Sequence, residues 1–269
     1  MANTYLTRTI PVGETGSKQK ATFSVWLKRS NLNGGSGNQN IFSNYESGTS
    51  YTLFRFDAND KLDIENYKSS STVLRCVTNR QFRDVNGWYH IVFKIDTTQA
   101  TNTNRWKLYI NGVEETSLGT ATYPSQNLNL TINEEGHIQN LGAMNGGTHF
   151  NGLMSHAHWT DGYAYDASSF GSTDSTTGEW KISTSPSVTY GTNGFVLLKD
   201  DNAVTDRSGQ SNNFTLGGGT LTQTEDCSSN VFATWNPLIA NTGATFTKGN
   251  TVVYRTTSGN YRRIGCTLG

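Results

Sequence analysis

Two carboxylates, Asp63 and Glu65, stand two positions apart in a segment where apolar and polar residues alternate. Positions i and i+2 of a β-strand point to the same side of a sheet. A retaining glycosidase needs two carboxyl groups about 5 to 5.5 Å apart, one as nucleophile and one as acid/base. Leu62 and Ile64 would face the opposite side, so the alternative is a carboxylate pair on a solvated outer face. We favour that alternative.

The histidines offer a second chemistry. His156 and His158 flank a single alanine, and His149 lies shortly before them. Two imidazoles two positions apart on a strand can bind one transition metal, with the other ligands supplied by symmetry mates in a trimer. No acidic ligand stands beside the pair, so we favour hydrogen-bonded surface histidines over a metal site at His156 and His158.

An oxygen-rich stretch includes Asp200, Asp201 and Asp206, and calcium takes oxygen ligands of this kind. Their spacing matches no fixed calcium loop, and Asx-turns explain the same residues without an ion. We therefore expect no cofactor, with calcium at these three aspartates as the alternative.

Aromatic residues in or beside polar loops provide more candidates than the charged residues do. An amphipathic ring next to amide side chains suits a sugar, although loop tyrosines also pack against their own loops. The sequence contains no serine nucleophile motif, phosphate-binding glycine loop or dinucleotide fingerprint. The predicted glycan-binding residues are Tyr45, Tyr51, Tyr67, Tyr163 and Tyr165.

The composition of the 269 residues is that of an uncharged polar surface on a β scaffold, with 34% hydrophobic and 16% charged residues. The formal net charge is zero, so we expect neither nucleic acid nor an anionic membrane as a partner. Three scattered cysteines argue against a disulfide framework and indicate synthesis in a reducing cytoplasm. We expect no classical secretion signal and no membrane insertion, because the start lacks an apolar core and no apolar run approaches the roughly 20 residues of a spanning helix.

Period-two alternation predicts strands along most of the chain. The central pair, 88–96 and 106–110, is followed by Asn111-Gly112, the strongest short-range hairpin signal. A short turn of helix is expected at 166–170, after the N-cap residue Asp166, and no helical period extends over twelve residues. The other predicted strands are 22–27, a strand beginning at 41, 51–56, 62–67, 73–77 and one within 150–162.

The central residues carry a family resemblance. The order Trp88-Tyr89-His90, an apolar strand, then Leu108-Tyr109-Ile110-Asn111-Gly112 resembles the laminin-G/concanavalin A-like jelly roll. The resemblance implies an all-β, concanavalin A-like (laminin-G-like) sandwich over residues 1–165. Glucanases of that fold carry a Glu-x-Asp-x-(x)-Glu strand, whereas Asn66-Tyr67 follows Glu65 here, so we expect no enzymatic activity.

A second resemblance covers the last two-fifths of the chain. Its motifs resemble the linker in laminin-G-like proteins of marine bacteriophages, which commonly leads into a SPRY-type sandwich. We therefore expect an extended linker with short strands at 166–244 and an incomplete β appendage or docking tail at 245–269. The motifs are 161–162, 169–171, 177–180, 190–195, 206–214 and 230–238.

The resemblance implies a non-enzymatic phage virion surface protein that is made in the host cytoplasm and binds glycans as a tail-fibre or spike adhesion module. One alternative is a capsid decoration protein without a ligand, and another is a glycan-cleaving enzyme of the same fold. The expected partners are other virion proteins held through the C-terminal segment, in a homo-oligomer. The predicted docking residues are Tyr190, Phe195, Phe232, Trp235 and Leu238.

Overall fold

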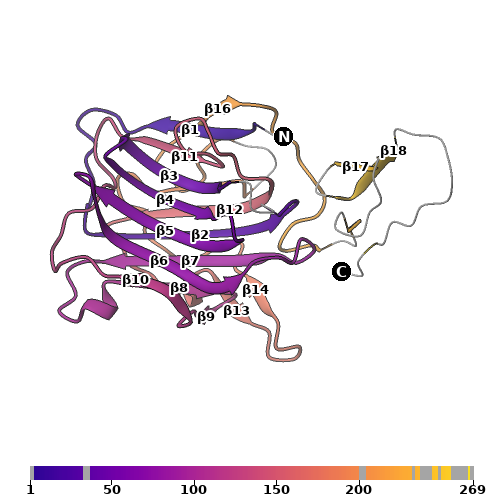
Figure 1. Ribbon diagram of the computed structural model, residues 1–269, viewed down its shortest axis with the longest axis horizontal. Coiled ribbons are helices and arrows are strands. Elements are labelled where there is room, and N and C mark those ends of the chain that lie inside the picture. Colours follow the sequence, from indigo (N-terminus) through magenta and orange to yellow (C-terminus); the bar gives the residue numbers. More distant parts are fainter. Residues whose placement is uncertain are drawn as a thin grey trace.

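Two antiparallel sheets stack face to face in the computed structural model (Figure 1). The structure describes residues 3–32, 37–199, 204–231, 234–236, 244–247, 250–255 and 266. The sandwich confirms the predicted all-β, concanavalin A-like jelly roll. In the described part of the chain, no helix has the length and apolar character needed to cross a membrane.

The larger sheet has eight strands. Its order is β10 (Leu118–Thr122), β6 (Ser71–Gln81), β5 (Lys61–Lys68), β4 (Ser50–Phe56), β3 (Gln39–Ser47), β11 (Ile138–Leu141), β1 (Tyr5–Thr9) and β16 (Thr215–Gly218). The six-stranded sheet has the order β15 (Phe195–Leu197), β12 (Gly152–Asp161), β2 (Lys20–Arg29), β7 (Tyr89–Asp96), β8 (Trp106–Ile110) and β9 (Val113–Glu114).

Smaller elements complete the described fold. Two hairpins pair β13 (Gly171–Thr173) with β14 (Trp180–Ile182) and β17 (Ala244–Thr247) with β18 (Val252–Arg255), and the second hairpin stands to one side of the sandwich in Figure 1. Two single turns of 3-10 helix are η1 (Asn102–Asn104) and η2 (Ala167–Ser169). The second turn confirms the short helix expected at 166–170, but Asp166 makes no capping bond and its carboxylate instead accepts from Lys94 Nζ and the Tyr109 hydroxyl.

Aromatic rings fill the space between the sheets. Phe23 on β2 stacks on Phe42 of β3, with ring centroids 4.9 Å apart, and it lies 4.8 Å from Phe54 of β4. All three side chains are almost fully buried. Each burial of a phenylalanine contributes about 1.5 to 3 kcal/mol, so alternation on facing strands explains why these segments form a sandwich.

The turn between β8 and β9 confirms the predicted hairpin. Asn111 has φ 49° and Gly112 has φ 79°, the left-handed pair that a type I′ turn requires. A Cβ atom on Gly112 would lie 2.3 Å from the ring of Trp180, so this glycine also permits close approach of a later segment.

Segment 128–132 alternates Leu and Ile with Asn and Thr, yet it forms no strand. Leu130 and Ile132 are buried in the main core. Its backbone bonds irregularly, with Leu130 N donating to Lys18 O and Thr52 Oγ1 donating to Thr131 O. The alternation thus reflects a loop that covers one end of the core.

Residues of the predicted linker 166–244 supply a strand to each sheet. Phe195 on β15 pairs with Trp159 of β12, and Thr215 on β16 pairs with Thr7 of β1. Phe195 and Phe214, whose ring centroids are 4.8 Å apart, both belong to the main core. The division into 1–165, 166–244 and 245–269 stays a prediction.

The stretch between β12 and β15 covers part of the outer face of the six-stranded sheet. Ala167 and Phe170 form a second apolar cluster with Val92 of β7. Partly buried Tyr165 and Trp180 pack against it. Here the outer face is an interior surface of the protein.

Candidate functional site

Three of the predicted tyrosines form a row across the outer face of the eight-stranded sheet. Tyr45 on β3 pairs in register with Tyr51 on β4, which pairs with Tyr67 on β5. The rings of Tyr51 and Tyr67 stack with centroids 5.2 Å apart. All three residues are partly exposed. We call Tyr45, Tyr51 and Tyr67 the tyrosine row.

An ionic cluster adjoins the tyrosine row. Asp63 accepts hydrogen bonds from Arg55 Nε and Nη2 at 3.0 and 2.7 Å, and two of 3.2 Å from Arg75. Glu65 accepts a hydrogen bond of 2.7 Å from Thr72 Oγ1. The bond to Asp63 raises the pKa of the Arg75 guanidinium above its usual value.

The expectation of a solvated carboxylate pair is therefore half right. Leu62 and Ile64 face the core as expected, so Asp63 and Glu65 lie on the outer face. They are nevertheless buried, with 1% and 6% of their surface exposed, and the side chains of neighbouring strands that contact them include Arg55 and Arg75. A carboxylate that accepts four bonds from two cations is a counter-ion and is poorly placed to attack a sugar.

The other two predicted tyrosines belong to a different part of the molecule. Tyr163 and Tyr165 follow β12, and their rings stack with centroids 6.0 Å apart. Thr22 on β2 holds this stretch, because its Oγ1 donates to Tyr163 O and accepts from Tyr165 N. Tyr163 is 42% exposed, whereas the hydroxyl of Tyr165 accepts a bond from Thr189 N. The structure thus separates the five tyrosines into two groups.

His156 and His158 are buried, which corrects the expectation of surface histidines. His156 has φ 47° at a register shift between β12 and β2, and its Nδ1 lies 2.7 Å from Ser155 Oγ. His158 Nδ1 lies 2.9 Å from the hydroxyl of Tyr190, and burial keeps the pKa of His158 well below its usual value. Among the described residues no group of three or more His, Cys, Asp or Glu is arranged to hold a metal. Metal binding at the pair stays a prediction.

His90 is a buried histidine that sequence reasoning did not single out as a site residue. Its Nε2 lies 2.9 Å from Ser24 Oγ, the separation of a nucleophile and its base. Trp180 Nε1, which can only donate, bonds to His90 Nδ1 at 2.9 Å. The proton of neutral His90 therefore sits on Nε2 and points to Ser24, so His90 cannot accept the serine proton.

The carboxylate of Asp206 bonds to its own loop and to strand β15. Oδ1 accepts from Val196 N at 2.9 Å and Ser208 N at 2.8 Å, and Oδ2 accepts from Ser208 Oγ and Asn212 N. The bond from Ser208 N is an Asx-turn contact, and the bonds from Val196 N and Asn212 N attach the loop to β15 and to the following segment. Asp200 and Asp201 lie outside the described residues, so calcium at this site stays a prediction.

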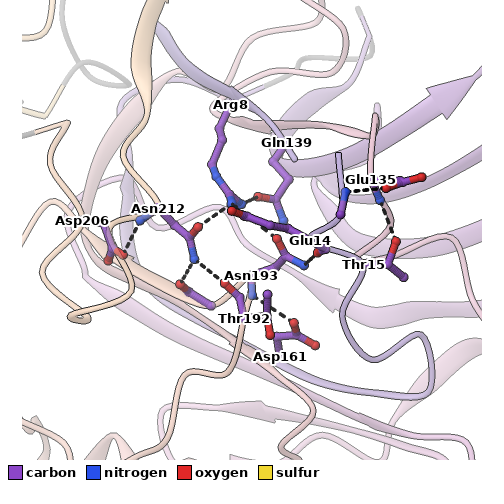
Figure 2. Close-up of polar contacts among 12 residues, drawn as sticks. Arg8, Glu14, Thr15, Glu135, Gln139, Asp161, Thr192, Asn193, Asp206 and Asn212 are labelled. Atoms are coloured by element: carbon purple, nitrogen blue, oxygen red, sulfur yellow. Dashed lines mark hydrogen bonds and ion pairs between the residues drawn. The ribbon is translucent and has the colours of Figure 1, made fainter. Parts of the chain in front are cut away.

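A buried arginine that sequence reasoning missed joins segments that are far apart in the chain (Figure 2). Arg8 on β1 donates to Gln139 Oε1 at 3.0 Å, Asn193 Oδ1 at 3.3 Å and Asn212 Oδ1. Asn193 N in turn donates to Asp161 at the end of β12. Burial lowers the pKa of the Arg8 guanidinium. The Asn residues of motifs 190–195 and 206–214 are thus intramolecular anchors.

Some of the predicted docking residues contact the chain itself, and others lie outside the described part of the structure. Phe195 is fully buried in the sandwich and Tyr190 bonds to His158, so both contact the chain itself. Trp235 is partly buried, and its backbone N donates to Asn250 O. Phe232 and Leu238 lie outside the described residues. Docking onto a partner stays a prediction.

A pocket of about 730 Å³ lies between the sandwich and the C-terminal segment. Leu221, Tyr254 and Trp88 contribute to its apolar wall. Asp226 also lines it, but its carboxylate is bound by Lys28 Nζ at 2.8 Å and by Trp88 Nε1 at 3.2 Å. None of the residues of the tyrosine row lines this pocket.

Comparison with protein families tests the fold independently. The Laminin_G_3 family, described as the concanavalin A-like lectin/glucanases superfamily, matches residues 3–164. The chain belongs to this family. Comparison with curated proteins finds no match. The family match ends before residue 165, so β15, β16 and the stretch that covers the six-stranded sheet lie outside it.

Solved structures with a similar fold come from several protein classes. A heptameric SAP-like pentraxin from Limulus polyphemus has 15% identity and a TM-score of 0.41, covering 59% of this chain and 70% of that one. Domain 4 of AbnA, a GH43 extracellular arabinanase from Geobacillus stearothermophilus in complex with arabinotriose, has 18% identity, a TM-score of 0.42 and coverage of 58% and 66%. Domains LG4-5 of the mouse laminin alpha1 chain have 10% identity, a TM-score of 0.40 and coverage of 59% and 42%. These similarities concern the fold alone.

Proposed function

We propose that this chain is a non-enzymatic glycan-binding module, and that the tyrosine row with its ionic cluster is the binding face. The observation that carries this proposal is the alignment of Tyr45, Tyr51 and Tyr67 on three neighbouring strands. Sugars require apolar contact and hydrogen bonds together. The aromatic rings offer the apolar contact, and their hydroxyls and the adjoining ion-paired side chains offer the hydrogen bonds.

The arrangement of the charges supports binding without cleavage. Asp63 is saturated by Arg55 and Arg75, and Glu65 is held by Thr72. Neither carboxylate is free to act as the nucleophile or acid of a glycosidase. The family also contains glucanases, so the alternative is a glycan-cleaving enzyme. That alternative predicts release of reducing sugar, which the variant Asp63→Asn would abolish.

The proposal extends to a biological setting through the linker motifs. Their resemblance to marine phage proteins supports a place on a virion surface, where the chain attaches the particle to host or environmental glycans as a fibre or spike component. Capsid decoration without a ligand is the alternative. Labelling and imaging of purified particles separates the two, because a handful of copies at the tail supports attachment and hundreds over the head support decoration.

A glycan array followed by calorimetry tests the binding face. Substitution of Tyr51 or Tyr67 by alanine is expected to weaken binding of an array hit by about tenfold, the loss of one aromatic contact. Tyr163→Ala, on the other side of the sandwich, is the matched control and should leave the affinity unchanged. Thermal unfolding of each variant checks that it folds. Loss of binding in Tyr163→Ala alone would move the site to that tyrosine pair, and a flat array would contradict glycan binding.

A further inference from the structure

A row of buried polar side chains runs across the inner face of the eight-stranded sheet. Arg8, Gln139, Asn44, Thr52 and Asn66 are neighbours in register on β1, β11, β3, β4 and β5. Each is at least nine-tenths buried. Five polar residues side by side in a sandwich interior require hydrogen-bond partners.

Direct bonds satisfy only part of this row. Arg8 Nη1 donates to Gln139 Oε1 at 3.0 Å, Asn66 Nδ2 donates to Thr52 Oγ1 at 2.5 Å, and Thr52 donates to Thr131 O at 2.6 Å. Within this row, the buried side-chain atoms without a hydrogen-bond partner are Gln139 Nε2, Asn44 Nδ2, Asn44 Oδ1 and Asn66 Oδ1.

The four unpaired atoms define the chemistry of what binds them. Two are amide nitrogens that donate, and two are amide oxygens that accept. A rotation of the Asn44 amide exchanges its two atoms and leaves this balance unchanged. The two NH₂ groups and nearby Arg8 disfavour a cation, and the two oxygens disfavour an anion. A small neutral molecule that both donates and accepts fits the set.

We propose that ordered water bonds to the Asn44 amide and links Gln139 to Asn66. The water completes a line of hydrogen bonds from the Arg8 network to β5. Asn44, Thr52 and Asn66 are the direct chain neighbours of Tyr45, Tyr51 and Tyr67, so the water line lies behind the tyrosine row. It holds β3, β4 and β5 in the register that aligns the three rings. This inference does not depend on what the rings bind.

Nuclear magnetic resonance of the full chain detects such water directly. Backbone amides of Asn44, Thr52 and Asn66 are expected to show cross-peaks with long-lived water. Amides of Phe42, Phe54 and Ile64, which lie on the same strands among apolar side chains, are the matched controls and should show none. Equal absence of cross-peaks at both sets would overturn the proposal.

Two leucine variants provide an independent readout. Asn44→Leu keeps the shape of the side chain and removes its amide. If water bonds to Asn44, the variant should lower the melting temperature, because the water and Gln139 then lose hydrogen-bond partners. If the interior is dry, the variant should be more stable, and a higher melting temperature would refute the proposal. Asn140→Leu is the control. Asn140 bonds directly to Thr7 Oγ1 and Gly146 N, so this variant should lower the melting temperature in either case.

Discussion

The indole Nε1 of Trp180 donates a hydrogen bond of 2.9 Å to Nδ1 of His90, whose ring also stacks on Trp26 with centroids 4.7 Å apart. This contact fastens β14 onto β7. It requires a neutral imidazole, because a protonated Nδ1 would confront another donor.

Acidification should therefore loosen the stretch that covers the six-stranded sheet. Burial lowers the pKa of His90 to about 3, whereas the unfolded chain has the usual value of 6.5. The stability that depends on neutral His90 is present above pH 6.5 and is lost as pH falls toward 3. At pH 4 the loss is about 3 kcal/mol. Urea unfolding at pH 7 and pH 4 measures it.

His90→Gln is the matched variant for this pH dependence. Its amide can accept from Trp180 and donate to Ser24 but does not titrate in this range. The variant should show a smaller difference in unfolding free energy between pH 7 and pH 4 than the unmodified protein. An equal difference would place the pH dependence elsewhere, with buried His158 as the next residue to test.

Removing one partner of the buried ion pair between Lys28 and Asp226 should lower the unfolding free energy far more than replacing both partners. The two side chains are 1% and 0% exposed, with 2.8 Å between Nζ and Oδ2. Asp226→Leu leaves the lysine charge buried and should cost about 3 to 5 kcal/mol in unfolding free energy. The double variant Lys28→Met with Asp226→Leu should recover most of that loss in urea titrations. If it is as unstable as the single variant, the pair is not what holds this segment.

Gly112→Ala should be more destabilising than an alanine at a comparable glycine. Gly112 has φ +79° and its added Cβ would meet the Trp180 ring, whereas Gly178 has φ +74° and open space around it. Gly178→Ala pays only the conformational cost of about 1 kcal/mol. Gly112→Ala adds displacement of Trp180, which a change in tryptophan fluorescence reports. Similar losses of stability in both variants would show that the Trp180 ring moves aside at little cost.

Arg8→Met should destabilise the whole sandwich, because it removes the donor to Gln139, Asn193 and Asn212 at a buried site. Leaving these acceptors unpaired costs about 1 to 3 kcal/mol for each group that finds no water. Arg8→Lys retains the charge but not the planar fork, so it should rescue only part of the loss. Thermal unfolding of the three proteins gives the order. Full rescue by lysine would mean that charge alone matters.

Local patterns were sufficient to predict most strands and the hairpin at Asn111-Gly112, since alternation and turn chemistry act over a few residues. The same patterns placed Asp63 and Glu65 on an outer face. They could not show that the pair is buried, because Arg55 and Arg75 arrive from neighbouring strands whose register depends on the whole sheet.

The candidate site needed the same long-range information. Tyr45, Tyr51 and Tyr67 appear in the sequence as separate loop or strand residues, and only the pairing of β3, β4 and β5 aligns them. Asn193 and Asn212 belong to motifs that the sequence shows, but their partner Arg8 lies near residue 1, far from both motifs. The nearest acidic residue to Arg8 in the sequence, Glu14, does contact it at 3.4 Å, but no local pattern points to the two asparagines.

The pairing of β16 with β1 has a consequence for synthesis. Thr215 and Thr7 are bonded neighbours at the edge of the larger sheet, although about two hundred residues separate them. Contacts this distant form slowly, and a nascent chain exposes its unfinished core until they close. Phe195 and Phe214 are synthesised after nearly all of the sandwich strands, so the ribosome holds an unsealed sandwich until these two residues emerge. Chaperone demand and sensitivity to early termination should therefore be concentrated in the interval before residue 214.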